Sequence, residues 1–379
     1  MGVVVVWMRF ILAVLIGVSF MCGGITVMAE EPTISSLSAV VYEPTGGLVL
    51  YAKNADIPRP MASTTKLMTA LLAAERLDAD AMVSVPAAAL PVEGSQVGLQ
   101  AGERISVRDL LAALLLASGN DAANALALLM AEDIPSFAAT MNQRAAQLGM
   151  THTTFVTPSG LDSGDHSASA YDMALLGAAV LQQPLLAQLC AAKSASMTLG
   201  GATITLSNHN KLLQMMDDCI GLKTGFTKKS GRCLVSAVQR NGITLIVVTL
   251  NGGDYWNDHM TLYDYGFSCV KQVALTQLIP QNTAVCGGVV EQVAVSAAMP
   301  EQVVVRTEET VHTKVEIPRF VWAPIKAGET LGSITVYAAD RVVCSVPVLA
   351  AQSVEMCPVL TASQRIRRRY GQLLEKLLS

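Results

Sequence analysis

A serine and a lysine three residues apart are the first pair in this sequence that could do chemistry. Ser63 and Lys66 bracket an S-T-T-K motif at the start of a stretch with helical spacing, where residues i and i+3 lie on the same face. A neutral lysine amine beside a serine hydroxyl can remove its proton and make it a nucleophile. The spacing alone is weak, because Ser268 and Lys271 repeat it, and we interpret that second copy as chance.

Two further motifs carry polar side chains suited to the same chemistry. Ser118 and Asn120 stand at a break between two helical stretches, where a hydroxyl and an amide can project into a cleft. Lys223-Thr224-Gly225 offers a carboxylate site and a glycine that allows close approach of a substrate backbone. A similar K-S-G follows six residues later, and each motif alone has a structural explanation as a cap, a turn or a strand end. Only the ordered set S-x-x-K, S-x-N, K-T-G is informative.

These motifs must be positioned by a domain that mixes strands and helices. Residues 38–42 with 48–51, and residues 234–238 with 243–250, each predict a β-hairpin. Helical spacing between them predicts helices at 63–75, 107–117 and 122–130. Strands at both ends with helices between them indicate that N- and C-terminal strands share one sheet. A turn is expected at 254–258, after the last strand.

Beyond residue 270 the composition changes to short alternating segments separated by turn residues, without helical periodicity. The segments are 289–295, 302–306, 311–317, 332–337 and 341–347. They predict a separate small all-β module with its boundary near 270–285.

The three motifs, taken with their flanking residues, resemble the D-alanyl-D-alanine carboxypeptidases, the low-molecular-weight penicillin-binding proteins. The similarity covers nearly all of the chain after residue 29, and it is carried by residues 61–75, 116–124, 155–162, 169–174, 221–227, 328–332 and 334–337. The resemblance implies an α/β (α+β) catalytic domain of the β-lactamase/transpeptidase type, an antiparallel sheet with a helical layer. It also favours the K-T-G at Lys223 over the copy at Lys229.

The resemblance implies a role for each residue of the set. Ser63 would form an acyl-enzyme with the stem peptide, Lys66 would be the base, and Ser118 would pass a proton to the departing D-alanine. Asn120 would orient the peptide. Lys223, Thr224 and Gly225 would bind its terminal carboxylate end, and the backbone N–H groups of Ser63 and Phe226 would form the oxyanion hole. We expect the pKa of Lys66 to be lowered by Lys223 and by a helix N-terminus.

The N-terminus has the layout of a secretory signal. Arg9 is followed by an uncharged apolar stretch and small residues before Glu30, so cleavage is expected after Ala29. An uncleaved membrane anchor is the alternative, because residues 10–28 could just span a bilayer.

The C-terminus carries a basic amphipathic pattern. Residues 365–379 hold four arginines, one lysine and one glutamate, while the apolar side chains follow one helical face. The apolar residues are Ile366, Tyr370, Leu373, Leu374, Leu377 and Leu378. This pattern predicts a membrane-surface helix; a helix docked on its own domain is the alternative.

Charge and composition exclude other classes of partner. The net charge of −4 argues against nucleic acid, which needs a basic surface. The five histidines lack ligand spacing, so no metal or other cofactor is expected. Seven cysteines remain after residue 29, an odd number without a compact framework, and we expect buried or free thiols.

We therefore predict four segments: a signal peptide (1–29), a D-alanyl-D-alanine carboxypeptidase domain (30–272), a small β-rich domain (273–359) and a basic amphipathic membrane-surface helix (360–379). The expected partners are peptidoglycan stem peptides ending in D-Ala-D-Ala, β-lactam antibiotics and the membrane surface. The expected place is the outer face of the cytoplasmic membrane. A β-lactamase of the same superfamily and a catalytically idle wall-binding scaffold are the alternatives.

Overall fold

The computed structural model describes residues 30–275, 281–358, 363, 366 and 369–370. The signal peptide predicted for residues 1–29 lies outside the described residues, as does most of the predicted C-terminal helix. The four described residues of that tail, Ser363, Ile366, Arg369 and Tyr370, are helical.

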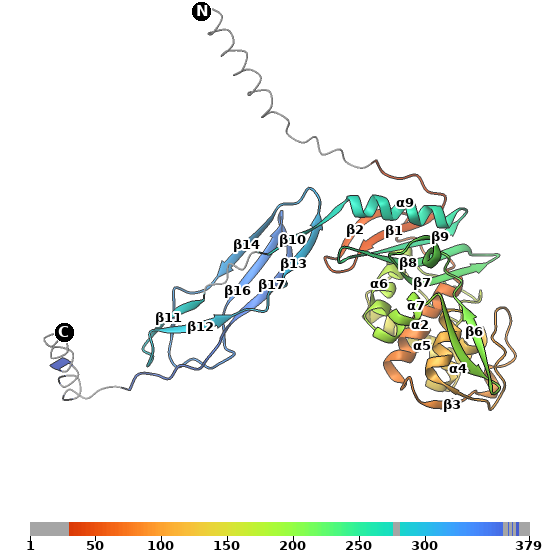
Figure 1. The fold of residues 1–379 in the computed structure, drawn as a ribbon, viewed down its shortest axis with the longest axis horizontal. Helices are drawn as coiled ribbons and strands as arrows, with labels where there is room; N and C mark the ends of the chain where they lie inside the picture. Colours follow the sequence, from red (N-terminus) through yellow and green to blue (C-terminus); the bar gives the residue numbers. More distant parts are fainter. Residues whose placement is uncertain (1–29, 276–280, 359–362, 364–365, 367–368, 371–379) are drawn as a thin grey trace, which may run out of the picture. The chain divides into compact units, whose positions relative to one another are not determined.

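A five-stranded antiparallel sheet forms the centre of the catalytic domain, with the strand order β2-β1-β9-β8-β7 (Figure 1). Its strands are β1 (Ser38–Glu43), β2 (Leu48–Lys53), β7 (Cys219–Thr227), β8 (Gly231–Arg240) and β9 (Ile243–Gly252). The pairing of β1 with β9 joins the two ends of the domain, and this confirms that N- and C-terminal strands share one sheet. Both predicted hairpins are present. Nearly every residue of β9 is buried, because helices cover both faces of the sheet.

The helical layer packs mainly on one face of this sheet, and α9 covers the other (Figure 1). The helices are α2 (Lys66–Arg76), α3 (Val107–Leu115), α4 (Asn120–Met130), α5 (Ile134–Gln147), α6 (Ala170–Leu181), α7 (Pro184–Ala191), α8 (Leu212–Met215) and α9 (Tyr255–Ser268), with the 3-10 turns η1 (Ala62–Thr65) and η2 (Ala87–Ala89). The turn expected at 254–258 is wrong: Asp254 is the N-cap of α9, and helix follows immediately.

Helix α2 lies at the centre of the core. Leu67, Met68 and Leu72 have no exposed surface, and the helix contacts α3, α4 and α6. Each such side chain contributes roughly 1.5–3 kcal/mol of hydrophobic burial. Several neighbouring helices start at side-chain caps, for example Ser106, which accepts a hydrogen bond from the backbone N–H of Asp109. Two small hairpins, β3 (Met82–Ser84) with β4 (Arg104–Ser106) and β5 (Ser194–Leu199) with β6 (Ala202–Ser207), complete the domain.

The C-terminal domain is all β, as predicted. One six-stranded sheet has the order β14-β16-β17-β12-β11-β15, and β10 pairs with β13 in a second sheet. The strands are β10 (Val270–Ala274), β11 (Asn282–Cys286), β12 (Gln292–Ser296), β13 (Gln302–Arg306), β14 (Val311–Glu316), β15 (Phe320–Trp322), β16 (Thr330–Ala338) and β17 (Arg341–Ala350). The sequence missed β10, β11 and β15. It also started β12 too early, because residues 289–291 belong to the turn between β11 and β12, which the hydrogen bond from the Val285 N–H to the Glu291 carbonyl oxygen closes at 2.8 Å.

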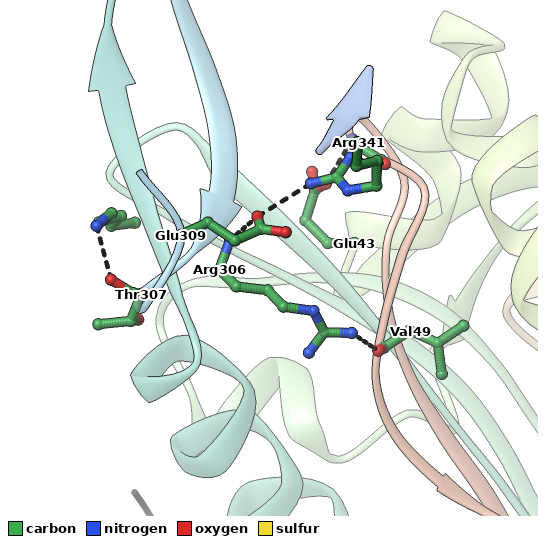
Figure 2. A network of polar contacts seen from close by, with 8 residues as sticks. Glu43, Val49, Arg306, Thr307, Glu309 and Arg341 are labelled. Carbon is green, nitrogen blue, oxygen red and sulfur yellow. Dashed lines mark hydrogen bonds and ion pairs between the residues drawn. The ribbon is translucent and has the colours of Figure 1, made fainter. Parts of the chain in front are cut away.

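Polar contacts connect the β-domain to the β1–β2 hairpin (Figure 2). Arg306 Nη2 donates to the carbonyl oxygen of Val49 at 2.6 Å. Arg341 donates to Glu309 at 3.1 Å, and the same Glu309 carboxylate accepts the N–H of Arg306 at 2.9 Å. Glu43 lies beside them and is fully buried; burial raises its pKa, while backbone N–H groups and Arg341 oppose the rise. These residues form the polar junction between the two domains.

The seven described cysteines are all free, and Cys190, Cys219 and Cys233 are buried. This agrees with the expectation of buried or free thiols. Within the described residues no single helix is long and apolar enough to cross a membrane. Helices α6 and α7 reach that length and apolarity only when taken together, and a bend of 107° separates them.

Candidate active site

The predicted nucleophile sits in a 3-10 turn rather than in the α-helix. Ser63 lies in η1, and Lys66 is the first residue of α2. Three residues complete one 3-10 turn, so side chains at i and i+3 eclipse each other. The Nζ atom of Lys66 accordingly lies 2.9 Å from Ser63 Oγ. Ala62, just before the serine, has φ +48°, a left-handed conformation that is strained for a residue with a Cβ.

Lys66 is fully buried, and three neutral acceptors surround its amine. Besides Ser63 Oγ, these are Asn120 Oδ1 and the carbonyl oxygen of Ser159, each at 2.7 Å. Burial lowers the pKa of Lys66 well below its usual value, and the charge of Lys223 lowers it further, whereas Asp121 opposes the change. Burial is therefore the larger cause, and the motif spacing did not predict it.

The break between α3 and α4 places the second motif beside this lysine. Ser118 has φ +60° and is 5% exposed, and Asn120 begins α4. The Nδ2 of Asn120 donates to the carbonyl oxygen of Glu93 at 2.6 Å. With one side of its amide on Glu93 and the other on Lys66, Asn120 holds the lysine. The peptide-orienting role implied by the resemblance stays a prediction.

The third motif lies on β7, next to the nucleophile turn. Lys223 is 1% exposed, its Nζ donates to the Thr224 carbonyl oxygen at 3.0 Å, and burial lowers its pKa to about 8. A Cβ on Gly225 would lie 2.9 Å from the backbone nitrogen of Ser63. The glycine thus lets β7 pack against the turn that carries the nucleophile. The K-T-G motif predicts that this glycine allows the approach of the substrate backbone, whereas this contact lies within the protein.

These motifs surround a cleft of about 250 Å³. Its lining includes the predicted residues Ser63, Ser118, Thr224, Gly225 and Phe226. Lys66, Asn120 and Lys223 are buried beside them. The structure therefore brings every predicted site residue into one region and divides them into a lining and a supporting layer.

The cleft also has residues that the sequence analysis missed. Ser95, His209 and Tyr255 line it, and the Arg232 guanidinium lies 5.6 Å from the ring centre of Phe226 and 5.5 Å from that of Tyr255. Burial, Lys223 and Lys66 lower the pKa of His209, which places it in the field of both lysines. These residues come from separate loops, a strand and the start of helix α9, and no local motif joins them.

A loop over residues 155–166 locks against the nucleophile turn. His166 Nδ1 accepts the backbone N–H of Val156 at 2.9 Å, so its ring proton is on Nε2, which lies 2.8 Å from Thr65 Oγ1. Thr65 in turn donates to the carbonyl oxygen of Ala62. Burial lowers the pKa of His166 to about 4, which keeps the ring neutral. The loop's Gly160, at φ +85°, is so close that a Cβ would lie 1.9 Å from the Ala62 oxygen.

The two duplicate motifs lie elsewhere. Ser268 is exposed at the end of α9, and Lys271 Nζ donates to the carbonyl oxygen of Thr307 in the β-domain. Lys229 is exposed in the turn between β7 and β8, where Ser230 bonds to Thr227. Neither copy faces the cleft.

An antiparallel sheet with a helical layer and a serine–lysine pair at their junction defines a transpeptidase-like fold of the β-lactamase type. Comparison with known families agrees: the D-alanyl-D-alanine carboxypeptidase family of S11 peptidases matches residues 25–254. The C-terminal domain of penicillin-binding protein 5 matches residues 275–356. The chain belongs to the S11 D-alanyl-D-alanine carboxypeptidase family.

Individual relatives extend the similarity across both domains. The D-alanyl-D-alanine carboxypeptidase DacB2 of Mycobacterium tuberculosis is 35% identical over 63% of this chain and 84% of its own length. DacF of Bacillus subtilis is 28% identical over 86% of this chain and 88% of its own. The crystal structure of penicillin-binding protein 5 from Haemophilus influenzae superposes with a TM-score of 0.70 at 26% identity, covering 86% of this chain and 98% of that one.

Proposed function

We propose that this chain is a serine-type D-Ala-D-Ala carboxypeptidase that removes the terminal D-alanine from peptidoglycan stem pentapeptides and is acylated by penicillin. The observation that carries the proposal is the fully buried Lys66 amine, 2.9 Å from Ser63 Oγ and with a lowered pKa. A lysine in this state is available as a neutral base beside a nucleophile. Family membership supplies the substrate class.

Acylation begins when Lys66 Nζ accepts the Ser63 proton and Oγ attacks the carbonyl carbon between the two D-alanines. The backbone N–H groups of Ser63 and Phe226 stabilise the negative oxygen of the tetrahedral intermediate. Ser118 then passes its proton to the nitrogen of the terminal D-alanine and takes one back from the protonated Lys66, so the C–N bond breaks and Lys66 is neutral again. Thr224, in the lining of the cleft, holds the substrate carboxylate, while Lys223 behind it supplies positive potential.

Deacylation repeats the proton transfers with water as the nucleophile. Lys66 takes a proton from water, which attacks the ester carbonyl carbon, and Ser63 Oγ leaves with the proton that Lys66 gives back. The products are the tetrapeptide and a regenerated serine. Asn120 Oδ1 and the carbonyl oxygen of Ser159 are not changed by acylation, so they keep the Lys66 amine in place through both halves of the reaction.

Mass spectrometry of a stem pentapeptide incubated with the purified full chain tests the proposal. The expected product has lost one D-alanine. The lifetime of the penicillin acyl-enzyme separates the alternatives, because slow release agrees with a carboxypeptidase and rapid turnover indicates a β-lactamase. A chain that neither releases D-alanine nor is labelled by penicillin is an idle scaffold.

We further propose that the chain is exported and held at the outer face of the cytoplasmic membrane by its tail, residues 360–379. The basic amphipathic pattern of the tail supports this attachment. Ile366 and Tyr370, both on the apolar face of the predicted helix, are 59% and 68% exposed. These side chains are therefore free to contact lipid.

A further inference from the structure

One edge of the β-domain carries a group of exposed apolar side chains, which we call the rim patch. It consists of Val289, Val290, Phe320, Trp322 and Met356, with exposed fractions of 55%, 41%, 47%, 70% and 57%. In the described part of the chain, thirteen large hydrophobic side chains are exposed, and these are five of them. Such a concentration in one place marks an interaction surface more often than chance exposure.

The aromatic half of the patch lies on β15. This strand pairs in parallel with β11, where Trp322 is opposite Cys286. Side chains alternate along a strand, so Phe320 and Trp322 share one face and Val321 takes the other. Val321 packs on a small core with Val285 and Val293, and the rings of Phe320 and Trp322 meet edge to face at 5.6 Å. The two rings therefore project from the outer face.

Backbone hydrogen bonds bring the aliphatic half beside the aromatic half. The N–H of Ala323 donates to the carbonyl oxygen of Cys286 at 3.0 Å, so the end of β15 stays next to β11. From there the chain turns through Gly287, which accepts the N–H of Cys357 at 2.7 Å. Gly288 forms a bridge with Met356, and the next residues are the two exposed valines. The segments that carry the two halves of the patch thus lie beside one another at the same edge of the sheet.

The position of the patch in the chain identifies its occupant. Met356 precedes the last described residues of the domain, and the amphipathic tail begins within about ten residues of it. The tail's described apolar residues Ile366 and Tyr370 are themselves exposed. The rim patch and the apolar face of the tail thus lie at the same end of the chain, and the tail is also rich in arginine. A single extended partner with an apolar interior and an anionic surface fits both.

We propose that the rim patch inserts into the membrane interface as a second contact beside the tail. Tryptophan is enriched at the level of lipid headgroups because its ring is amphipathic. The patch contains no ionisable side chain, and its exposed neighbours Glu291, Arg319 and Glu355, two acidic and one basic, add no positive charge. Its contribution is hydrophobic, whereas the tail adds attraction to anionic lipid. The inference rests on the proposed membrane attachment and is independent of the catalytic assignment.

Tryptophan fluorescence tests the proposal directly. The chain has three tryptophans, so Trp7→Phe with Trp256→Phe leaves Trp322 as the reporter in the full chain. With vesicles of phosphatidylglycerol and phosphatidylethanolamine, the emission should shift to the blue, and phospholipids brominated near the headgroup should quench it. Co-sedimentation of protein with vesicles without shift or quenching would overturn the rim patch and leave the tail attachment standing. Failure to sediment would overturn both.

Matched variants measure the contribution of the patch. Phe320→Ser with Trp322→Ser should weaken vesicle binding by about tenfold, since two aromatic side chains no longer leave water. Val342→Ser is the control, because Val342 is 52% exposed in the same domain but outside the patch. D-alanine release from a soluble peptide should be unchanged in both variants. If the patch variant binds vesicles as the unmodified chain does, or instead loses self-association, lipid is not the occupant.

Discussion

The Nζ atom of Lys66 lies 2.7 Å from the carbonyl oxygen of Ser159, in a loop 93 residues further along the chain. This contact joins helix α2 to the loop that contains Ser159. The loop contacts the Lys66 amine through a neutral carbonyl oxygen and not through an ionisable side chain. A carbonyl oxygen orients the amine but stabilises its charged form less than a carboxylate would. Burial and Lys223 can therefore keep the pKa of Lys66 low while its position is fixed.

His166 should act as a positioning residue for that contact. Replacing it by alanine removes the hydrogen bond to Thr65 and the acceptor for the Val156 N–H, so the loop that carries Ser159 loses its anchor. We expect His166→Ala to slow penicillin acylation by about tenfold and to cost roughly 1–3 kcal/mol of stability. Stopped-flow acylation kinetics and chemical denaturation measure the two effects.

His166→Gln separates positioning from stability, because its amide can donate to Thr65 and should restore part of the acylation rate. His152 is exposed, and His152→Ala is the matched control. An unchanged acylation rate in His166→Ala would show that the loop does not need this anchor.

The pH dependence of acylation should report the pKa of Lys66. The base must be neutral, so the rate falls as pH drops through this pKa. The positive charge of Lys223 lowers the pKa of Lys66, so Lys223→Gln should raise it and move the acid limb to higher pH. The measurement is the second-order rate constant for penicillin acylation against pH.

Lys229→Gln is the control for charge, because this exposed lysine lies on the same β7–β8 hairpin but outside the cleft. The acid limb of the acylation rate in Lys229→Gln should lie at the same pH as in the unmodified chain. An acid limb that moves to lower pH in Lys223→Gln would contradict the assignment of Lys66 as the base.

Gly225→Ala should disable the site while leaving most of the fold intact. The added Cβ would lie 2.9 Å from Ser63 N and 3.0 Å from Thr64 N, so the nucleophile turn must move away from β7. We expect acylation to fall by about a hundredfold, as when an oxyanion donor is lost, at roughly 1–3 kcal/mol of stability. Gly253→Ala, where a Cβ meets only ordinary contacts at 3.6 Å, should acylate normally. Equal rates in both variants would exclude a need for close packing at Gly225.

The sequence predicted the parts of the site that are written in short motifs. Each of the three motifs lies within one short segment, so its spacing and the family resemblance were sufficient to place it. The motifs contain Ser63 and Lys66, Ser118 and Asn120, and the K-T-G of β7. The carbonyl of Ser159 leaves no such trace, because every residue has a carbonyl. The real partners of Asn120 depend on residues that only tertiary packing brings near.

The fold was predictable to a similar degree. The strands of the two hairpins in the central sheet either alternate apolar and polar residues or contain several apolar residues in a row, so both hairpins were predicted. Strand β15 has only three residues, and β11 is short and partly exposed, so neither gave a clear period. His209 and Tyr255 were missed because each enters the cleft from its own loop or helix end.

Removal of residues 365–379 should move most of the protein from the membrane to the soluble fraction, because the basic apolar face is lost. D-alanine release from a soluble pentapeptide should remain the same, since the cleft lies wholly in the catalytic domain. Fractionation followed by a penicillin-labelling assay measures both. A truncated protein that stays wholly on the membrane would indicate that the N-terminal segment is the main anchor.

The central claim is that Ser63 is the nucleophile, and mass spectrometry of the penicillin-treated chain tests it most directly. We expect one covalent penicillin per chain, located on the peptide that contains Ser63. Ser63→Ala should lose both the adduct and D-alanine release, whereas Ser268→Ala, in the duplicate motif, should keep both. An adduct that persists in Ser63→Ala, or one located on another serine, would contradict the assignment.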